Sequence, residues 1–141
     1  MGVKLERIVK PYYDWLHEGK IMARKCTKCG AVEWPPLLGC NTCGSPDMEW
    51  VEMSGKGQMV QMVMPAPITR KPEMNDIKPY CFGVIELPEG PAVNAMVRGV
   101  DKKNKDLVAA KLPIDVHMVI IPRDGYDTVI FELDEIPKPE K

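Results

Sequence analysis

Four of the five cysteines in this 141-residue chain lie in two C-x-x-C pairs, each followed by a glycine. The pairs are CTKCG, which begins at Cys26, and CNTCG, which begins at Cys40. In such a pair a tight turn aims two sulfur atoms at one point, and the glycine lets the backbone turn without a Cβ clash. Two pairs supply the four thiolates that fill the tetrahedral shell of Zn²⁺ and leave no position for water or substrate. The spacing therefore predicts a structural zinc site whose ligands are Cys26, Cys29, Cys40 and Cys43.

Two other chemistries use cysteines in such pairs. An iron ion in a rubredoxin-like tetrathiolate has the same four ligands, so the spacing alone does not separate iron from zinc. A thioredoxin-type redox centre needs only one C-x-x-C pair, placed where a helix follows a strand. Both pairs here lie among Gly, Pro and Asn residues instead. We therefore expect a metal clip, with zinc preferred, rather than a redox site.

The N-terminal sequence and the overall charge bear on location and partners. MGVKLERIVK lacks an apolar core of signal-peptide length, and no run approaches the roughly 18 apolar residues of a membrane span. We therefore expect a cytoplasmic protein with no membrane segment, in which reduced thiols bind metal rather than form disulfides. The formal net charge is −1, which gives no general attraction for nucleic acid.

The segment KPYYDWLHEGK, upstream of the cysteines, predicts a short helix. Pro11 is tolerated in its first turn, and Gly19 provides a C-terminal stop. Tyr12, Tyr13 and Trp15 on this helix are three of the nine aromatic residues in the chain. They either cover one side of the rest of the protein or face a partner or ligand. The sequence favours neither interpretation over the other.

After Cys43 the sequence pattern becomes β. Several segments bounded by Gly, Pro, Asp or Asn are rich in apolar residues, and two of them, PAVNAMVRGV and PIDVHMVIIP, alternate with a period of two. Residues 65–78 form a long loop, and residues 100–113 are a polar excursion that includes a helical turn. Five or six short strands with this spacing suit a small closed barrel, and an OB-fold fits best. A small β-sandwich is the alternative.

We therefore expect a mainly β protein in four parts. Residues 1–22 form the N-terminal helical segment, and residues 23–47 form a rubredoxin-like zinc ribbon. Residues 48–136 form the OB-fold barrel, and residues 137–141 are a tail.

Few residues outside the cysteine pairs invite a catalytic interpretation. Cys81 lies in the apolar segment PYCFGVIEL, where a lone cysteine usually fills a core rather than acts as a nucleophile. In the alternating segment PIDVHMVIIP, His117 lies on the face of the strand opposite to the apolar residues. This position is typical of a surface residue rather than of a general base. No nucleophile motif such as G-x-S-x-G occurs. We therefore assign no catalytic residue.

Several motifs together resemble one protein family. An aromatic helix that ends in EGK-I is followed by C-x-x-C-G, W-P-P, a second C-x-x-C-G-S, an SGKG turn and a strand that contains VIELPEGP. From about Tyr12 to Ile121, this combination resembles the zinc-ribbon plus OB-fold proteins that are associated with acyl-CoA enzymes. The resemblance implies an accessory subunit in a hetero-oligomer with a thiolase, a hydroxymethylglutaryl-CoA synthase assembly or a hotdog-fold enoyl-CoA hydratase.

The resemblance also assigns roles to the two parts of the fold. It implies that the four cysteines bind the metal, that the ribbon helps to dock the partner, and that the barrel takes up part of an acyl-CoA. One feature departs from the family. A basic residue often follows the double proline, but here Pro35 and Pro36 are followed by Leu37 and Leu38. A phosphate or partner contact made by that basic residue is therefore absent from this chain.

A binding site for a coenzyme A thioester needs two kinds of residues, and the sequence can be searched for both. The anionic nucleotide end of the thioester needs Lys or Arg, and its pantetheine arm needs a groove with apolar walls. Lys102, Lys103 and Lys105 are candidates for the nucleotide end, although each lysine taken singly is better explained as part of a solvated loop. Met59, Met62 and Met64 suit an adaptable apolar surface, and ordinary core packing is the simpler account.

We therefore expect a non-catalytic, acyl-CoA-binding scaffold subunit, most readily of a thiolase and alternatively of an enoyl-CoA hydratase. A single-stranded nucleic-acid-binding module is the alternative from a different class, because ribbons and OB-folds both occur in that role. Such a module needs stacking aromatic residues along a basic groove. The barrel segment offers only five aromatic residues amid an excess of acid, so we disfavour a nucleic-acid partner. They are Trp50, Tyr80, Phe82, Tyr126 and Phe131.

Overall fold

A computed structural model describes residues 10–36, 39–64, 77, 79–123 and 125–137. The chain forms two compact units. The first comprises Met1–Gly55, Pro88–Pro91 and Ile120–Val129, and the second comprises Lys56–Leu87, Ala92–Val119 and Ile130–Lys141. None of the helices in the described ranges combines the length and apolar character that a membrane crossing requires. Leu37 and Leu38, together with most of the loop expected at residues 65–78, lie outside the described residues.

Helix α1 (Lys10–His17) has the ends that the sequence predicts. Pro11 lies in the first turn, where its missing N–H costs no hydrogen bond. At the other end the N–H of Gly19 donates to the carbonyl of Leu16 at 3.0 Å, and the N–H of Lys20 donates to the carbonyl of Trp15 at 2.8 Å. Gly19 has a φ of 87°, a conformation that glycine adopts without strain. The predicted N-terminal helix is confirmed.

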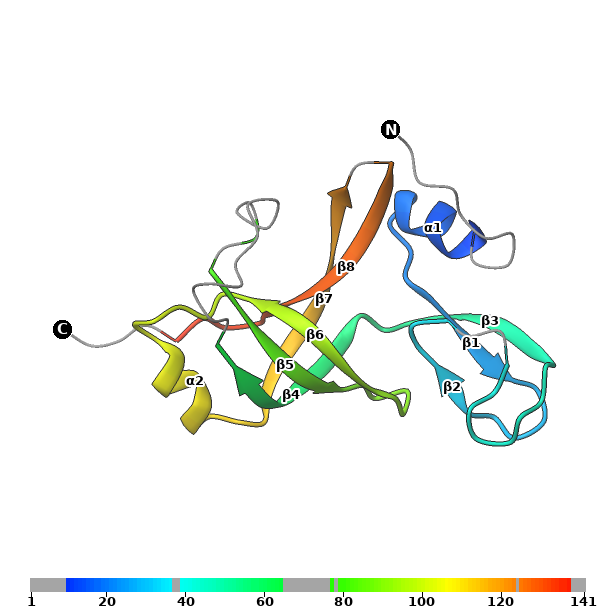
Figure 1. The fold of residues 1–141 in the computed structure, drawn as a ribbon, viewed down its shortest axis with the longest axis horizontal. Helices are drawn as coiled ribbons and strands as arrows, with labels where there is room; N and C mark the ends of the chain where they lie inside the picture. Colours follow the sequence, from blue (N-terminus) through cyan, green and yellow to red (C-terminus); the bar gives the residue numbers. More distant parts are fainter. Residues whose placement is uncertain (1–9, 37–38, 65–76, 78, 124, 138–141) are drawn as a thin grey trace. The chain divides into compact units, whose positions relative to one another are not determined.

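The metal-binding segment is built on a three-stranded antiparallel sheet in the order β2-β1-β3 (Figure 1). Its strands are β1 (Met22–Cys26), β2 (Val32–Glu33) and β3 (Met48–Glu52). Strand β3 begins at the residue where the barrel is expected to start, yet it pairs with β1 over the whole length of both strands. Pairing of β1 with β3 positions the two C-x-x-C turns at the same end of the sheet. The domain boundaries expected from the sequence stay predictions.

The remaining strands form a closed five-stranded barrel in the order β4-β5-β6-β8-β7. They are β4 (Lys56–Val63), β5 (Tyr80–Glu86), β6 (Ala92–Arg98), β7 (Ile114–Arg123) and β8 (Tyr126–Leu133). The pairing of β6 with β8 is parallel, and helix α2 (Lys105–Ala110) lies between β6 and β7 in the chain (Figure 1). This strand order and the position of the helix are those of an OB-fold. The predicted barrel is confirmed, and the alternative of a β-sandwich is wrong.

The barrel core contains the lone cysteine. Cys81 is fully buried, with its Sγ 4.0 Å from the Sδ of Met59. Burial raises the pKa of the Cys81 thiol to about 11, so the thiol stays protonated at neutral pH. Gly83 leaves room for Met59, because a Cβ at Gly83 would lie 2.5 Å from the methionine sulfur. Cys81 is therefore a core residue, as the sequence predicts.

Candidate metal centre and partner-facing residues

The four paired cysteines converge on one point of the first unit. All four Sγ atoms lie within 4.8 Å of one another. The Sγ atoms of Cys26 and Cys43 are 3.5 Å apart, as are those of Cys29 and Cys40. Four sulfurs at ~2.3 Å from one tetrahedral ion lie ~3.8 Å apart, so the donor set and its spacing fit a single Zn²⁺. The four cysteines therefore form one cluster that could hold a metal ion as a tetrathiolate.

The two C-x-x-C turns have the same backbone pattern. The N–H of Gly30 donates to the carbonyl of Cys26 at 3.0 Å, and the N–H of Gly44 donates to the carbonyl of Cys40 at 2.9 Å. Both glycines have positive φ angles, 79° and 78°. Residues with a Cβ are strained in this conformation, which explains why glycine follows the second cysteine of each pair.

In each C-x-x-C pair, a backbone N–H contacts the sulfur of the first cysteine and favours its thiolate form. The N–H of Cys29 points at the Sγ of Cys26, and the N–H of Cys43 points at the Sγ of Cys40, both at 3.5 Å. The contact with Cys29 lowers the pKa of Cys26 to about 6, and the contact with Cys43 likewise lowers the pKa of Cys40. A hydrogen bond to the charged form favours the thiolate, which is the species that binds metal.

The aromatic residues of α1 have three different environments. Tyr12 is only 7% exposed and belongs to the core, where burial raises its pKa to about 12. Tyr13 is half-buried and makes an edge-to-face contact with Tyr126, with ring centroids 6.2 Å apart. Trp15 is also half-buried, and its ring lies 5.1 Å from that of Trp50. Only Tyr13 and Trp15 therefore keep exposed ring surface for a partner.

Trp15 is part of a cluster that the sequence does not single out. The guanidinium carbon of Arg24 lies 4.8 Å from the ring centroid of Trp50. Arg24 and Trp50 are directly opposite each other on β1 and β3. The sequence groups Trp50 with the barrel, whereas the structure places it in the sheet of the ribbon. An alternating pattern predicts a strand but does not indicate which strand it will pair with.

The two short motifs that carry much of the family resemblance contact each other. Ser54 begins the SGKG turn, and Glu89 lies in the ELPEGP turn between β5 and β6. The backbone N–H of Ser54 donates to Glu89 Oε2 at 2.8 Å. The two motifs are therefore parts of one structural contact, although they are separated by more than 30 residues.

Comparisons with known proteins agree with this architecture. Residues 16–49 match a family model described as the ChsH2 rubredoxin-like zinc ribbon domain. A DUF35 domain-containing scaffold protein from Methanothermobacter thermautotrophicus is 30% identical over 110 residues, which cover 75% of this chain and 77% of the relative. This chain is a member of the DUF35 family.

Two other relatives of this DUF35 chain match it over only part of their length. Benzoylsuccinyl-CoA thiolase subunit BbsA from Thauera aromatica is 31% identical over 75 residues, which cover 53% of this chain and 49% of the relative. A probable enoyl-CoA hydratase alpha subunit from Thermomonospora curvata is 25% identical over 89 residues, which cover 63% of this chain and 27% of the relative. The matched region of the chain therefore spans half or less of the length of each of these two proteins.

A solved structure shares the fold of the DUF35 chain. The structure described as Ltp2-ChsH2(DUF35) aldolase superposes with a TM-score of 0.66 at 20% identity. The match covers 93% of this chain and 98% of the other. At this identity the likeness shows a common fold of helix, ribbon and barrel.

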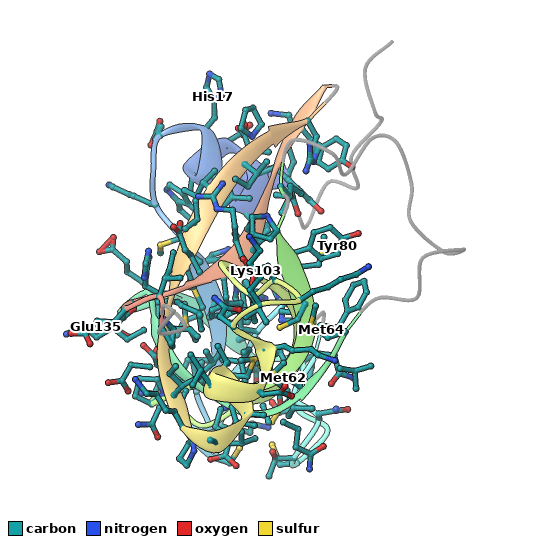
Figure 2. All side chains as sticks on the ribbon, turned by 90° about the vertical axis from the view of Figure 1, so that its left-hand side faces the viewer. His17, Met62, Met64, Tyr80, Lys103 and Glu135 are labelled. Carbon is teal, nitrogen blue, oxygen red and sulfur yellow. The ribbon has the colours of Figure 1, made fainter. Side chains whose placement is uncertain are left out.

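The three lysines expected at the nucleotide end of CoA lie together in the DUF35 barrel unit. Lys102 and Lys103 are exposed on the turn that leads into α2, and Lys105 is the exposed first residue of that helix. Figure 2 shows Lys103 on this turn. Asp101 holds the turn through its Oδ1, which accepts the N–H of Lys103 at 2.8 Å. None of the three ammonium groups forms an ion pair with a described carboxylate.

A shallow groove of about 140 Å³ lies on the outer face of β4, β5 and β6. Its floor is apolar, and Val63 and Phe82 are unusually exposed for such residues, at 68% and 44%. Of the methionines of β4, Met59 is buried in the core, whereas Met62 lines the groove (Figure 2). The side chains that line the groove are Gln61, Met62, Val63, Phe82, Val84 and Asn94.

His117 lies on the surface of the DUF35 barrel, in an ionic cluster. Its Nδ1 is 2.7 Å from Asp134 Oδ1, and its Nε2 is 3.9 Å from Glu132 Oε2. Arg98 donates to the same oxygen of Glu132 at 2.7 Å. The histidine is half-exposed and lies against one carboxylate of β8 and one that directly follows this strand, which agrees with its interpretation as a surface residue.

Proposed function

We propose that this DUF35 chain is a non-catalytic accessory subunit of an acyl-CoA enzyme complex. In this role it scaffolds the catalytic subunit and holds part of the acyl-CoA substrate. The observation that carries the proposal is the match to a DUF35 scaffold protein over three-quarters of both chains. The reacting groups then come from the partner. This chain helps to position and orient the acyl-CoA substrate, and such positioning makes a large contribution to catalysis.

A thiolase-type enzyme is the partner that we favour. The relative that is named as a thiolase subunit shares 31% of the aligned residues, against 25% for the hydratase subunit. The hydratase match also covers only 27% of that relative. An enoyl-CoA hydratase is therefore the second candidate for the partner.

We assign the tetrathiolate centre to structural zinc. Four protein thiolates complete the preferred coordination of Zn²⁺, so the ion has no position at which to activate water or polarise a carbonyl. Its role here is to fix the two turns at the end of the ribbon sheet. Metal binding and folding are coupled in modules of this size.

The barrel unit carries the surfaces that we assign to acyl-CoA. The groove over β4, β5 and β6 has an apolar floor and two carboxamides, Gln61 and Asn94. An uncharged arm with amide groups, such as pantetheine, matches this lining. Lys102, Lys103 and Lys105 supply the positive charge that the nucleotide end requires.

The binding role can be tested by calorimetry with CoA and dephospho-CoA. Replacing the three lysines together by Gln is expected to weaken CoA binding about 10-fold, because each ammonium lost removes a phosphate contact. Lys111→Gln is the matched control, since Lys111 is an exposed lysine at the other end of α2. Equal CoA affinity in the triple variant and in the control contradicts the assignment of these lysines.

The scaffold role can be tested by coexpression with a thiolase-type subunit of the same organism. The two chains are expected to copurify in fixed stoichiometry, and the complex is expected to show more thiolysis than the thiolase subunit alone. The isolated DUF35 chain is expected to turn over no acyl-CoA. Robust turnover by the isolated chain, or full activity of the partner without it, contradicts the proposal. Tight binding of single-stranded DNA or RNA in a filter assay at physiological salt favours the nucleic-acid alternative instead.

A further inference from the structure

One face of the ribbon sheet carries three half-buried side chains that stack in series. The Arg24 guanidinium lies over the Trp50 ring at 4.8 Å, and the Trp15 ring meets Trp50 edge-on at 5.1 Å with an interplanar angle of 69°. They come from β1, β3 and α1, all within the first unit. Leu16 and Tyr12, which are buried, anchor the helix that presents Trp15. We call Trp15, Arg24 and Trp50 the ribbon anchor.

Arg24 is a positively charged side chain that pairs with none of the carboxylates in the described ranges. Glu33 is its direct partner across to β2, yet Glu33 Oε1 accepts the backbone N–H of Asn41 at 3.1 Å. Within the described part of the chain, Arg24 forms no salt bridge, and its buried Nε has no hydrogen-bond partner. An arginine stays protonated at any physiological pH. The guanidinium therefore offers a fixed positive charge at a half-exposed site.

The composition of the ribbon anchor is that of a binding hot spot. Tryptophan and arginine are enriched among the residues that dominate protein interfaces. Stacking on Trp50 already restricts the guanidinium, so less side-chain entropy is lost when a ligand binds it. The planar group pairs with carboxylates through two parallel N–H···O bonds, and the terminal nitrogens, Nη1 and Nη2, are the ones that a partner reaches when Nε is buried.

We propose that the ribbon anchor binds a segment of the catalytic partner in which an acidic side chain lies next to an apolar one. The carboxylate pairs with Arg24, and the apolar side chain packs on the exposed edges of Trp15 and Trp50. We choose this occupant for its complementary charge, because the ribbon anchor combines two aromatic rings with an arginine that forms no ion pair with a described carboxylate. The proposal rests on the proposed function, since the partner is the thiolase-type subunit of the complex.

The test is the affinity of the two purified subunits, measured by biolayer interferometry at several salt concentrations. Arg24→Gln is expected to weaken the complex about 10- to 30-fold at low salt, as hot-spot truncations do. It is also expected to flatten the salt dependence of Kd, because a charge pair at the interface is lost. Trp15→Leu, which keeps an apolar side chain of helical propensity, is expected to weaken the complex while leaving its salt dependence unchanged.

Two variants serve as matched controls. Lys25→Gln removes the same charge from the adjacent position of β1, where the side chain points to the opposite face of the sheet. Glu33→Gln changes the cross-strand neighbour of Arg24 and keeps a hydrogen-bond acceptor for Asn41. Both are expected to bind the partner within about threefold of the wild type, as peripheral substitutions do. Zinc content and circular dichroism of each variant establish that the ribbon is folded.

The outcomes separate this inference from the proposed function. If the wild-type chain binds no thiolase-type subunit, the proposed function fails and the inference falls with it. If the wild type binds but folded Arg24→Gln binds equally well, the inference alone is wrong. If Arg24→Gln loses CoA affinity and keeps partner affinity, the anchor serves the anionic ligand and the docking assignment is overturned.

Discussion

The backbone N–H of Ser54 donates to the carboxylate of Glu89 at 2.8 Å. Ser54 lies between β3 and β4, and Glu89 lies in the turn that connects β5 to β6. Glu89 is half-buried, and its second oxygen, Oε1, is buried without a hydrogen-bond partner among the described residues. The contact ties the segment that leaves the ribbon sheet to the hairpin turn between β5 and β6.

We predict that Glu89→Ala lowers the free energy of unfolding by about 1–3 kcal/mol, because the Ser54 N–H loses a charge-assisted hydrogen bond. Glu89→Gln keeps an acceptor and is expected to lose less than half of that amount. The measurement is urea denaturation followed by fluorescence. Glu86→Ala is the control, since Glu86 is exposed on β5. Equal stability of Glu89→Ala and the control would show that the contact contributes nothing.

The metal centre predicts one Zn²⁺ per chain after purification under reducing conditions, as measured by elemental analysis. Cys26→Ser and Cys43→Ser are expected to lose the metal and the ordered ribbon, because a folded ribbon requires all four ligands. The barrel strands are expected to keep most of their circular dichroism signal. Stoichiometric iron in place of zinc would identify a rubredoxin-type centre, and absence of both metals would contradict the assignment.

We predict that substitutions of Tyr12 and Trp15, both on α1, affect different properties, namely stability for Tyr12 and partner binding for Trp15. Tyr12→Ala is expected to lower the free energy of unfolding by about 3–5 kcal/mol, because a large buried side chain leaves a cavity. Trp15→Ala is expected to weaken binding of the partner while shifting the melting temperature little, since Trp15 is half-exposed. Thermal denaturation and partner affinity, measured on both variants, check this contrast. A collapse of the melting temperature in Trp15→Ala with unchanged partner affinity would show that the helix serves only the core.

Cys81 predicts a loss of stability at alkaline pH. Its thiol has an ordinary pKa of 9.0, which rises to about 11 in the folded protein. Between these values the unfolded chain releases the proton that the folded chain retains, so stability falls as pH rises from 9 to 11. The steepest loss is about 1.4 kcal/mol per pH unit. Cys81→Ala lacks this ionisation, so the difference in stability between wild type and variant is expected to shrink over the same range.

The features that depend on local spacing could be predicted from the sequence. The convergence of the four cysteines follows from two C-x-x-C pairs, and the ends of α1 follow from Pro11 and Gly19. The barrel follows from the alternation of β6 and β7 and the turn residues between strands. All of these depend on residues that are neighbours in the chain.

The features that depend on strand register could not be predicted. The pairing of Arg24 with Trp50 arises because β3 returns beside β1, and no local pattern distinguishes this partner from a barrel strand. The exposed groove depends on the side of the barrel to which Phe82 and Val63 point. The contact between Ser54 and Glu89 joins two turns that each look like ordinary loops in the sequence.

The order of strand pairing has a consequence for synthesis on the ribosome. All three strands of the ribbon sheet, together with the four metal ligands, have been translated by residue 52. The barrel seam instead joins Val97 to Phe131 and closes only when β8 has left the exit tunnel. Since domains tend to fold from the N-terminal side during translation, the ribbon can acquire its metal while most of the barrel is still unmade. Zinc starvation would therefore leave the ribbon of the nascent chain unfolded at a stage when the apolar barrel strands are not yet buried and can aggregate.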